Sequence, residues 1–168
     1  ITASVRISED NDPVAEWERH DKELMDHCTI LNDFQFDKLH FVSEIGTDLY
    51  VDLVKNHIWV GGGCYTPEGV FFNPNMPTEE CFCMPDRNNV NGIVRASKPL
   101  SYSGKLIEDF WFKFEDGRVV TYGAKNGQET LKELLDTDEG SRHLGEVALI
   151  SYDSPISNMN ILFYNTLF

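Results

Sequence analysis

The sequence predicts an α+β fold that is rich in strand, with an N-terminal helix and one further helix. Three observations lead to this class: apolar residues at helical spacing near the N-terminus, an alternating run over 48–54, and a hairpin pattern over 110–122. A helix repeats its apolar face every three to four residues, whereas a half-buried strand repeats it every second residue. The 168 residues are enough for one domain with a sizeable core.

The first helix is predicted over about 13–31. Asp12 would cap its N-terminus and Pro13 would occupy its first turn, positions that these residue types prefer. Residues of the expected apolar face recur at helical spacing: Trp17, Leu24, Cys28 and Leu31. His20 and His27 share a face of this helix, and we expect both at the surface or at an interface.

Short strands are predicted next, over 39–42, 48–54 and 57–60. In the second of these, Leu49, Val51 and Leu53 fall on one face, with Asp48 and Asp52 on the other. The segment 64–91 contains four of the seven prolines and no long periodic run. We therefore expect an irregular, loop-rich segment, which is a common place for functional residues.

The β pattern resumes at 93–96 and leads into the hairpin. Phenylalanines alternate at 110, 112 and 114, and Asp116-Gly117 is the dipeptide typical of a type I′ turn. The returning strand would cover 119–122.

The last third of the chain should hold the second helix and one more strand. Asn126 and Glu129 have the spacing of a capping box, which predicts a helix ending near 136. The apolar run 145–151 predicts a strand. The segment 161–168 fits a strand or a loop.

Charge excludes two classes of partner. The chain has 28 Asp and Glu against 14 Lys and Arg, a formal net charge of −14. Nucleic acids and anionic membrane surfaces both require basic patches, so neither is an expected partner. A metal ion or the amino terminus of a peptide is compatible with this charge.

The cellular compartment is inferred from the cysteines and from missing targeting signals. Four cysteines, with no CxxC pair for structural zinc, favour free thiols in a reducing cytosol. No apolar run approaches the ~18 residues of a membrane span, and no signal peptide is visible. The expected localisation is therefore cytoplasmic.

Glu79 and Glu80 form the first candidate site. They follow Pro74 and Pro77, whose fixed φ angles stiffen the loop, and a stiff loop can hold a carboxylate as a metal ligand or general base. Because adjacent side chains tend to point apart, the two carboxylates would serve different roles. The alternative is a solvated acidic loop, or a short helix capped by Thr78.

Glu146 is the second candidate, at the head of the apolar run 145–151. A carboxylate at the start of a buried strand is costly unless it is paired or bound to a metal. The alternative is a carboxylate at the strand edge that faces water. The sequence has no HExxH, GxSxG, Walker or GxGxxG motif, so a zincin-type peptidase is excluded.

Several segments together resemble one family, the thermophilic aminopeptidase family of metallopeptidases. The matching segments are Gly46-Thr47-Asp48-Leu49, Asn75-Met76-Pro77-Thr78-Glu79-Glu80, Gly92, Ser103-Gly104, Gly145-Glu146-Val147-Ala148 and 160–168. The resemblance extends from about residue 12 to 168. It implies a two-metal aminopeptidase in which Glu80 and Glu146 are metal ligands and come close together through the fold. Glu79 would be the general base or would position water.

The resemblance also implies a division of the chain. Residues 1–35 would be an interdomain segment and helix, and 36–168 the N-terminal part, or first half, of the catalytic domain. The family's later segment with His and Asp ligands has no counterpart, so we expect a chain truncated at its C-terminal end and inactive alone. Its metal site would be weak or empty.

The implied cofactors are two divalent ions: zinc, cobalt or magnesium. The implied partners are peptide substrates and a second copy of the chain in a homodimer. Two alternatives stay open: a non-enzymatic acidic module that binds a cation or a protein, and a glycosidase that uses Glu80 and Glu146 as its carboxylate pair.

Overall fold

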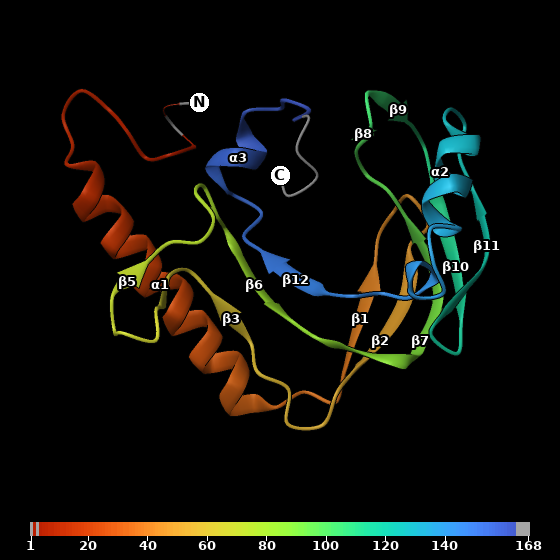
Figure 1. Ribbon diagram of the computed structural model, residues 1–168, viewed down its shortest axis with the longest axis horizontal. Helices are drawn as coiled ribbons and strands as arrows, with labels where there is room; N and C mark the ends of the chain where they lie inside the picture. Colours follow the sequence, from red (N-terminus) through yellow and green to blue (C-terminus); the bar gives the residue numbers. More distant parts are fainter. Residues whose placement is uncertain (1, 3, 164–168) are drawn as a thin grey trace. The chain divides into compact units, whose positions relative to one another are not determined.

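The computed structural model describes residues 2 and 4–163 (Figure 1). Helices and mostly antiparallel strands alternate irregularly along this part of the chain, which confirms the α+β class. The chain forms two compact units. The first unit contains the described residues of 1–35, 56–83 and 147–160, and the second unit contains those of 36–55, 84–146 and 161–168. The predicted domain boundary between residues 35 and 36 concerns the whole protein and stays a prediction.

The first unit combines a long helix with a small antiparallel sheet. Helix α1 (Pro13–Phe34) packs against β3 (Val60–Gly61) and β6 (Glu80–Cys83). The sheet has the order β12-β6-β3, with β12 (Val147–Ile150) at one edge (Figure 1). The remaining elements are the pair β4 (Cys64–Tyr65) and β5 (Phe71–Phe72), and the short helix α3 (Pro155–Asn158).

Helix α1 begins as predicted and runs three residues further. The Asp12 carboxylate accepts a hydrogen bond from the Val14 amide at 3.0 Å, and the helix ends at Gln35, whose φ of 47° is left-handed. The predicted apolar face is buried at Trp17, Leu24 and Cys28. The expectation for His27 is confirmed, since this side chain is exposed.

The expectation that His20 lies at the surface is wrong. Its side chain is 5% exposed, because it follows Trp17 by three residues and precedes Leu24 by four. Those spacings put it on the buried face of α1.

The second unit is built on a five-stranded antiparallel sheet with the order β1-β2-β7-β10-β11. Its strands are β1 (Lys38–Val42), β2 (Asp48–Leu53), β7 (Pro85–Arg95), β10 (Trp111–Glu115) and β11 (Arg118–Gly123). The smaller elements are the hairpin β8 (Leu100–Tyr102) and β9 (Lys105–Ile107), the helix α2 (Gln128–Leu135) and the 3-10 helix η1 (Gly140–Arg142).

The alternation predicted for β2 places its apolar face in the core of this unit. The core cluster is Leu49, Val51, Val90, Phe114, Val119 and Leu135. On the other face, the Asp48 carboxylate accepts from His40 Nε2 at 2.8 Å, and Asp52 pairs with Lys38 at 3.1 Å. Both aspartates therefore have a structural explanation in cross-strand pairs.

The expectation of an irregular segment over 64–91 is wrong. It contains β4, β5, β6 and the first half of β7. These strands include β6, which pairs with β12, a strand distant in sequence. A local sequence pattern therefore does not predict them. The predicted strand at 57–60 is correct only at its end, where β3 begins at Val60.

The two turns of the second unit gave different outcomes. Asp116 and Gly117 have φ angles of 48° and 78°, as a type I′ turn requires. The capping box at Asn126 is wrong, because Gly127 is the N-cap residue of α2 and the Asn126 amide donates instead to Glu108 at 2.5 Å. The end of α2 and the strand within 145–151 agree with the predictions.

The C-terminal segment is only partly described. Residues 161–163 have no regular secondary structure, and the rest of the segment predicted as strand or loop lies outside the described residues. No helix in the described part of the chain combines the length and apolar character needed to cross a bilayer.

Candidate functional site

Glu80 is the first residue of β6, Glu79 directly precedes it, and the two side chains face different pockets of the first unit. Glu80 lines a pocket of about 540 Å³, and Glu79 lines one of about 190 Å³. Successive side chains of a strand point to opposite faces, which explains the separation. The structure therefore keeps the two carboxylates apart, as expected for side chains with different roles. The Met76–Pro77 bond that precedes them is cis.

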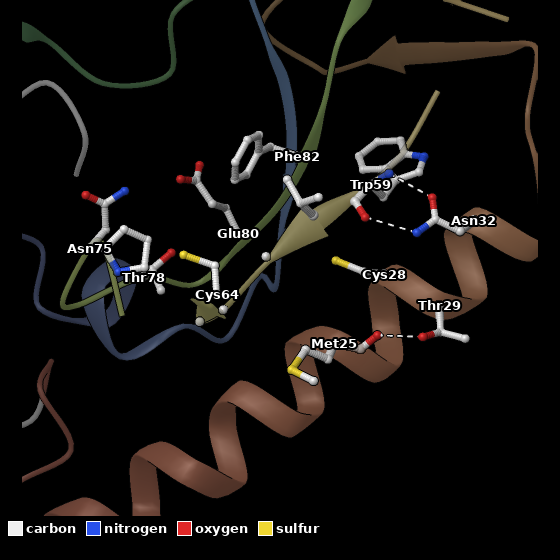
Figure 2. Close-up of a pocket in the computed structure, with 15 residues that line it drawn as sticks. Met25, Cys28, Thr29, Asn32, Trp59, Cys64, Asn75, Thr78, Glu80 and Phe82 are labelled. Atoms are coloured by element: carbon white, nitrogen blue, oxygen red, sulfur yellow. Dashed lines mark hydrogen bonds between the residues drawn. The ribbon is translucent and has the colours of Figure 1, made fainter. Parts of the chain in front are cut away.

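The pocket beside Glu80 has one wall from α1 and others from β3, β6 and their loops (Figure 2). Asn32 of α1 holds this arrangement together: its amide donates to the Trp59 carbonyl at 3.0 Å, and its side-chain oxygen accepts from the Trp59 amide at 2.7 Å. The lining side chains labelled in Figure 2 are Met25, Cys28, Thr29, Asn32, Trp59, Cys64, Asn75, Thr78, Glu80 and Phe82.

Glycine is required where β3 meets β6. A Cβ atom at Gly61 would lie 2.5 Å from the backbone oxygen of Glu80 and 3.3 Å from the Cys28 sulfur. The close approach of these backbones brings Glu80 to the pocket wall. The Gly61-Gly62-Gly63 run thus has a packing explanation in the described structure.

The buried thiols near this pocket stay protonated at neutral pH. Burial raises the pKa of Cys28, and burial together with the Cys28 contact raises the pKa of Cys81 to about 12. A protonated thiol is a poor nucleophile and a poor metal ligand. None of the four cysteines, all of which lie in the described part of the chain, forms a disulfide, which agrees with the prediction of thiols.

Glu79 is held in a buried ion pair with Arg6. The guanidinium donates to Oε1 at 2.6 Å and to Oε2 at 3.1 Å, and the two side chains are 13% and 6% exposed. Such a two-point contact fixes the position and orientation of a carboxylate.

His20 joins the same network. Its Nε2 lies 2.8 Å from the Thr78 carbonyl oxygen and 3.7 Å from Glu79 Oε2, and its Nδ1 lies 2.9 Å from Arg6 Nη2. The network therefore connects the N-terminal segment and α1 to the residues that precede β6.

Glu146 is exposed and directly precedes β12. The following residue, Val147, is opposite Cys83, while Glu80 is opposite Ile150. Glu146 is therefore four residues along the chain from the partner of Glu80, which corresponds to about 13 Å in an extended strand. The predicted approach of the two carboxylates to within a few ångströms stays a prediction.

The described residues do not form a complete metal site by themselves. No group of three or more His, Cys, Asp or Glu side chains in the described part of the chain is arranged to hold a metal ion.

Sequence reasoning missed Arg6 and His20. Arg6 is 73 positions from Glu79 and lies in a segment without periodicity, so nothing in the sequence relates the two residues. His20 could have been found, because its spacing from Trp17 and Leu24 already places it on the buried face of the helix.

Comparison with known proteins identifies the family. The family of thermophilic metalloproteases (M29) matches residues 1–168. Aminopeptidase AmpS of Bacillus subtilis is 50% identical over 168 residues, which is 100% of this chain and 40% of that protein. Aminopeptidase T of Thermus aquaticus is 49% identical over 100% of this chain and 41% of its own length.

A solved structure agrees with the sequence comparison. Wild-type AmpT from Thermus thermophilus superimposes with a TM-score of 0.88 at 47% identity, covering 92% of this chain and 39% of that one. The chain thus spans about two fifths of the length of these relatives. From the match over its whole length, the chain belongs to the thermophilic metalloprotease family (M29).

Proposed function

We propose that this chain is part of a metal-dependent aminopeptidase, a hydrolase that releases N-terminal residues from peptides. The family match and the relatives, which are named aminopeptidases, support this activity. The observation that carries the proposal for this chain is the position of Glu80. Its side chain lines a pocket of about 540 Å³, which is large enough for the end of a peptide.

Glu80 and Glu146 are the proposed metal ligands. Carboxylate oxygens suit hard and borderline divalent ions, and we propose two such ions, zinc, cobalt or magnesium. A bound ion would supply Lewis-acid chemistry and a more acidic water. We also propose that the chain alone is inactive, because two carboxylates offer a divalent ion too few ligands.

Glu79 is the proposed general base. Pro74 and Pro77 precede it in the chain, and the Arg6 pair holds its carboxylate in one orientation. In this role Glu79 would accept a proton at Oε2, the oxygen with the longer contact to Arg6, 3.1 Å against 2.6 Å. We further propose peptide substrates, a homodimer and a cytoplasmic location for the whole protein.

Variants of the full-length protein test these roles separately. Glu80→Gln and Glu146→Gln should weaken metal binding, because each removes a ligand. Glu79→Gln should lower kcat by about 100-fold or more while metal affinity changes little, because it removes a base. The measurements are metal titration of the chelator-treated protein and peptide hydrolysis with metal restored.

Glu139→Gln is a matched control, since Glu139 is exposed and belongs to the second unit. Equal loss of metal affinity in the Glu79 and Glu80 variants would refute the division of roles. Metal binding without any peptide hydrolysis by the wild-type protein would favour the non-enzymatic binding module instead.

A further inference from the structure

The Arg6 side chain is fixed by contacts on several sides. Besides the two bonds to Glu79, its guanidinium lies 5.3 Å from the centre of the Trp17 ring. The backbone on either side is also fastened: the Trp17 indole donates to the Val5 carbonyl at 2.9 Å, and the Asn11 amide donates to the Arg6 carbonyl at 2.8 Å.

The backbone of Arg6 is left-handed, with φ of 53°. For a residue other than glycine this conformation costs roughly 1–2 kcal/mol, so it persists only where surrounding contacts impose it. The hydrogen bonds of Val5, Arg6 and Asn11 are contacts of that kind. They direct the guanidinium toward Glu79. Without them, a charged side chain in a segment with no helix or strand would be expected to face water.

The hydrogen bonds also determine the state of His20. A guanidinium has only donors, so Nδ1 of His20 must be the acceptor in its 2.9 Å contact with Arg6. The single ring proton then lies on Nε2, which donates to the Thr78 carbonyl oxygen at 2.8 Å. His20 is therefore neutral and in one tautomer, and it fixes the backbone one residue before Glu79.

We propose that Arg6 and His20 are positioning residues of the active site, which act by holding Glu79 in the orientation of a general base. This inference rests on the proposed function. Arg6 orients the carboxylate by its two-point contact, and His20 fixes the Thr78 carbonyl, so both the side chain of Glu79 and the backbone before it are held. Both residues line the same pocket of about 190 Å³ as Glu79, and each acts through its contact with Glu79 or with the residue before it.

Kinetics of the full-length protein test the proposal. Arg6→Met should lower kcat about 10- to 100-fold, with KM and metal affinity within about threefold, because a misplaced catalytic group loses its alignment. In the Glu79→Gln background, Arg6→Met should cause no further loss. Arg6→Lys should keep an intermediate kcat, because it preserves the charge but not the planar fork. Guanidinium ion at millimolar concentration should restore part of the activity of Arg6→Ala.

Arg19→Gln is the matched control. Arg19 is an exposed arginine of α1 that pairs with Glu16 and Glu23 and makes no contact with Glu79. If Arg6→Met does not fold, Arg6→Lys decides, and an unchanged kcat in that variant overturns the proposal. Losses from Arg6→Met and Glu79→Gln that simply multiply would also overturn it.

Nitrogen-15 NMR of histidine-labelled protein gives a readout that does not depend on activity. His20, assigned by comparison with His20→Phe, should show a protonated Nε2 and an unprotonated Nδ1. The opposite tautomer or an imidazolium would overturn the contact with Arg6. A wild-type protein with the expected tautomer but no metal-dependent hydrolysis would refute the proposed function, whereas an active wild type with a fully active Arg6→Met would refute the positioning role.

Discussion

The two units of the chain bury different kinds of side chain. The core of the second unit consists of apolar residues from β2, β7, β10, β11 and α2. The first unit contains every buried acid, histidine and thiol of the described residues: His20, Asp21, Cys28, His57, Glu79, Cys81 and Cys83. Removing ionisable groups from water is costly, so the first unit gives up stability that the second unit retains.

The difference suggests a division of labour. A buried charge is tolerated when it is paired with good geometry, as Glu79 is with Arg6 at 2.6 Å, and Asp21 accepts from the Asn73 amide at 3.0 Å. Side chains held in this way have one fixed position. A catalytic group needs a fixed position, whereas the stability of the fold does not depend on it. We therefore interpret the first unit as the part that carries Glu79 and Glu80, whereas Glu146 is the last residue of a segment of the second unit.

The largest expected loss of stability comes from a substitution in the core of the second unit. Phe114→Ala removes a ring that is 3% exposed and should cost about 3–5 kcal/mol. Hydrogen exchange in the full-length protein should accelerate by roughly two to three orders of magnitude over β7, β10 and β11, and much less over β6. Val120→Ala, at an exposed position of β11, should have little effect. Equal acceleration of hydrogen exchange in both units would show that they unfold together, and it would contradict the distinction between them.

A smaller effect is expected where the first unit is tightest. Gly61→Ala places a Cβ atom 2.5 Å from the Glu80 backbone oxygen, so β3 and β6 must move apart. The expected cost is about 1–3 kcal/mol. Faster hydrogen exchange confined to β3 and β6 would be the measured result. Gly145→Ala is the control, because no atom lies within 4 Å of the Cβ position there. An unchanged exchange rate at β6 would mean that the contact is not tight in solution.

The smallest effect concerns acid stability in the second unit. Hydrogen bonds from Lys132 and then from Arg142 hold the pKa of Asp136 below its usual value of 3.8. The unfolded chain therefore binds this proton first as pH falls, so the stabilisation is present above pH 3.8 and is lost below it. In the Asp136→Asn variant, the melting temperature of the second unit should fall less steeply between pH 5 and 3. Because Asp136 is at the surface, the change should be small, and a steeper fall would contradict the assignment.

The sequence alone determined the local elements. Three elements were predicted correctly because each depends on residues close together in sequence. They are helix α1 with its Asp12 cap, the alternation of β2 and the turn at Asp116-Gly117. The family resemblance, carried by the segments around Glu80 and Glu146, was legible for the same reason. The family is confirmed by the comparisons.

Only the tertiary structure decided which distant groups meet. Strand β6 exists because β3 and β12 pair with it, and Glu79 is buried because Arg6, 73 residues away, reaches it. Long-range pairing and burial depend on how the whole chain folds, and no spacing within a segment records them. Asn126 illustrates the same limit. Its side chain donates to Glu108, 18 residues away, and does not cap the neighbouring helix, because a tertiary partner can replace a local cap.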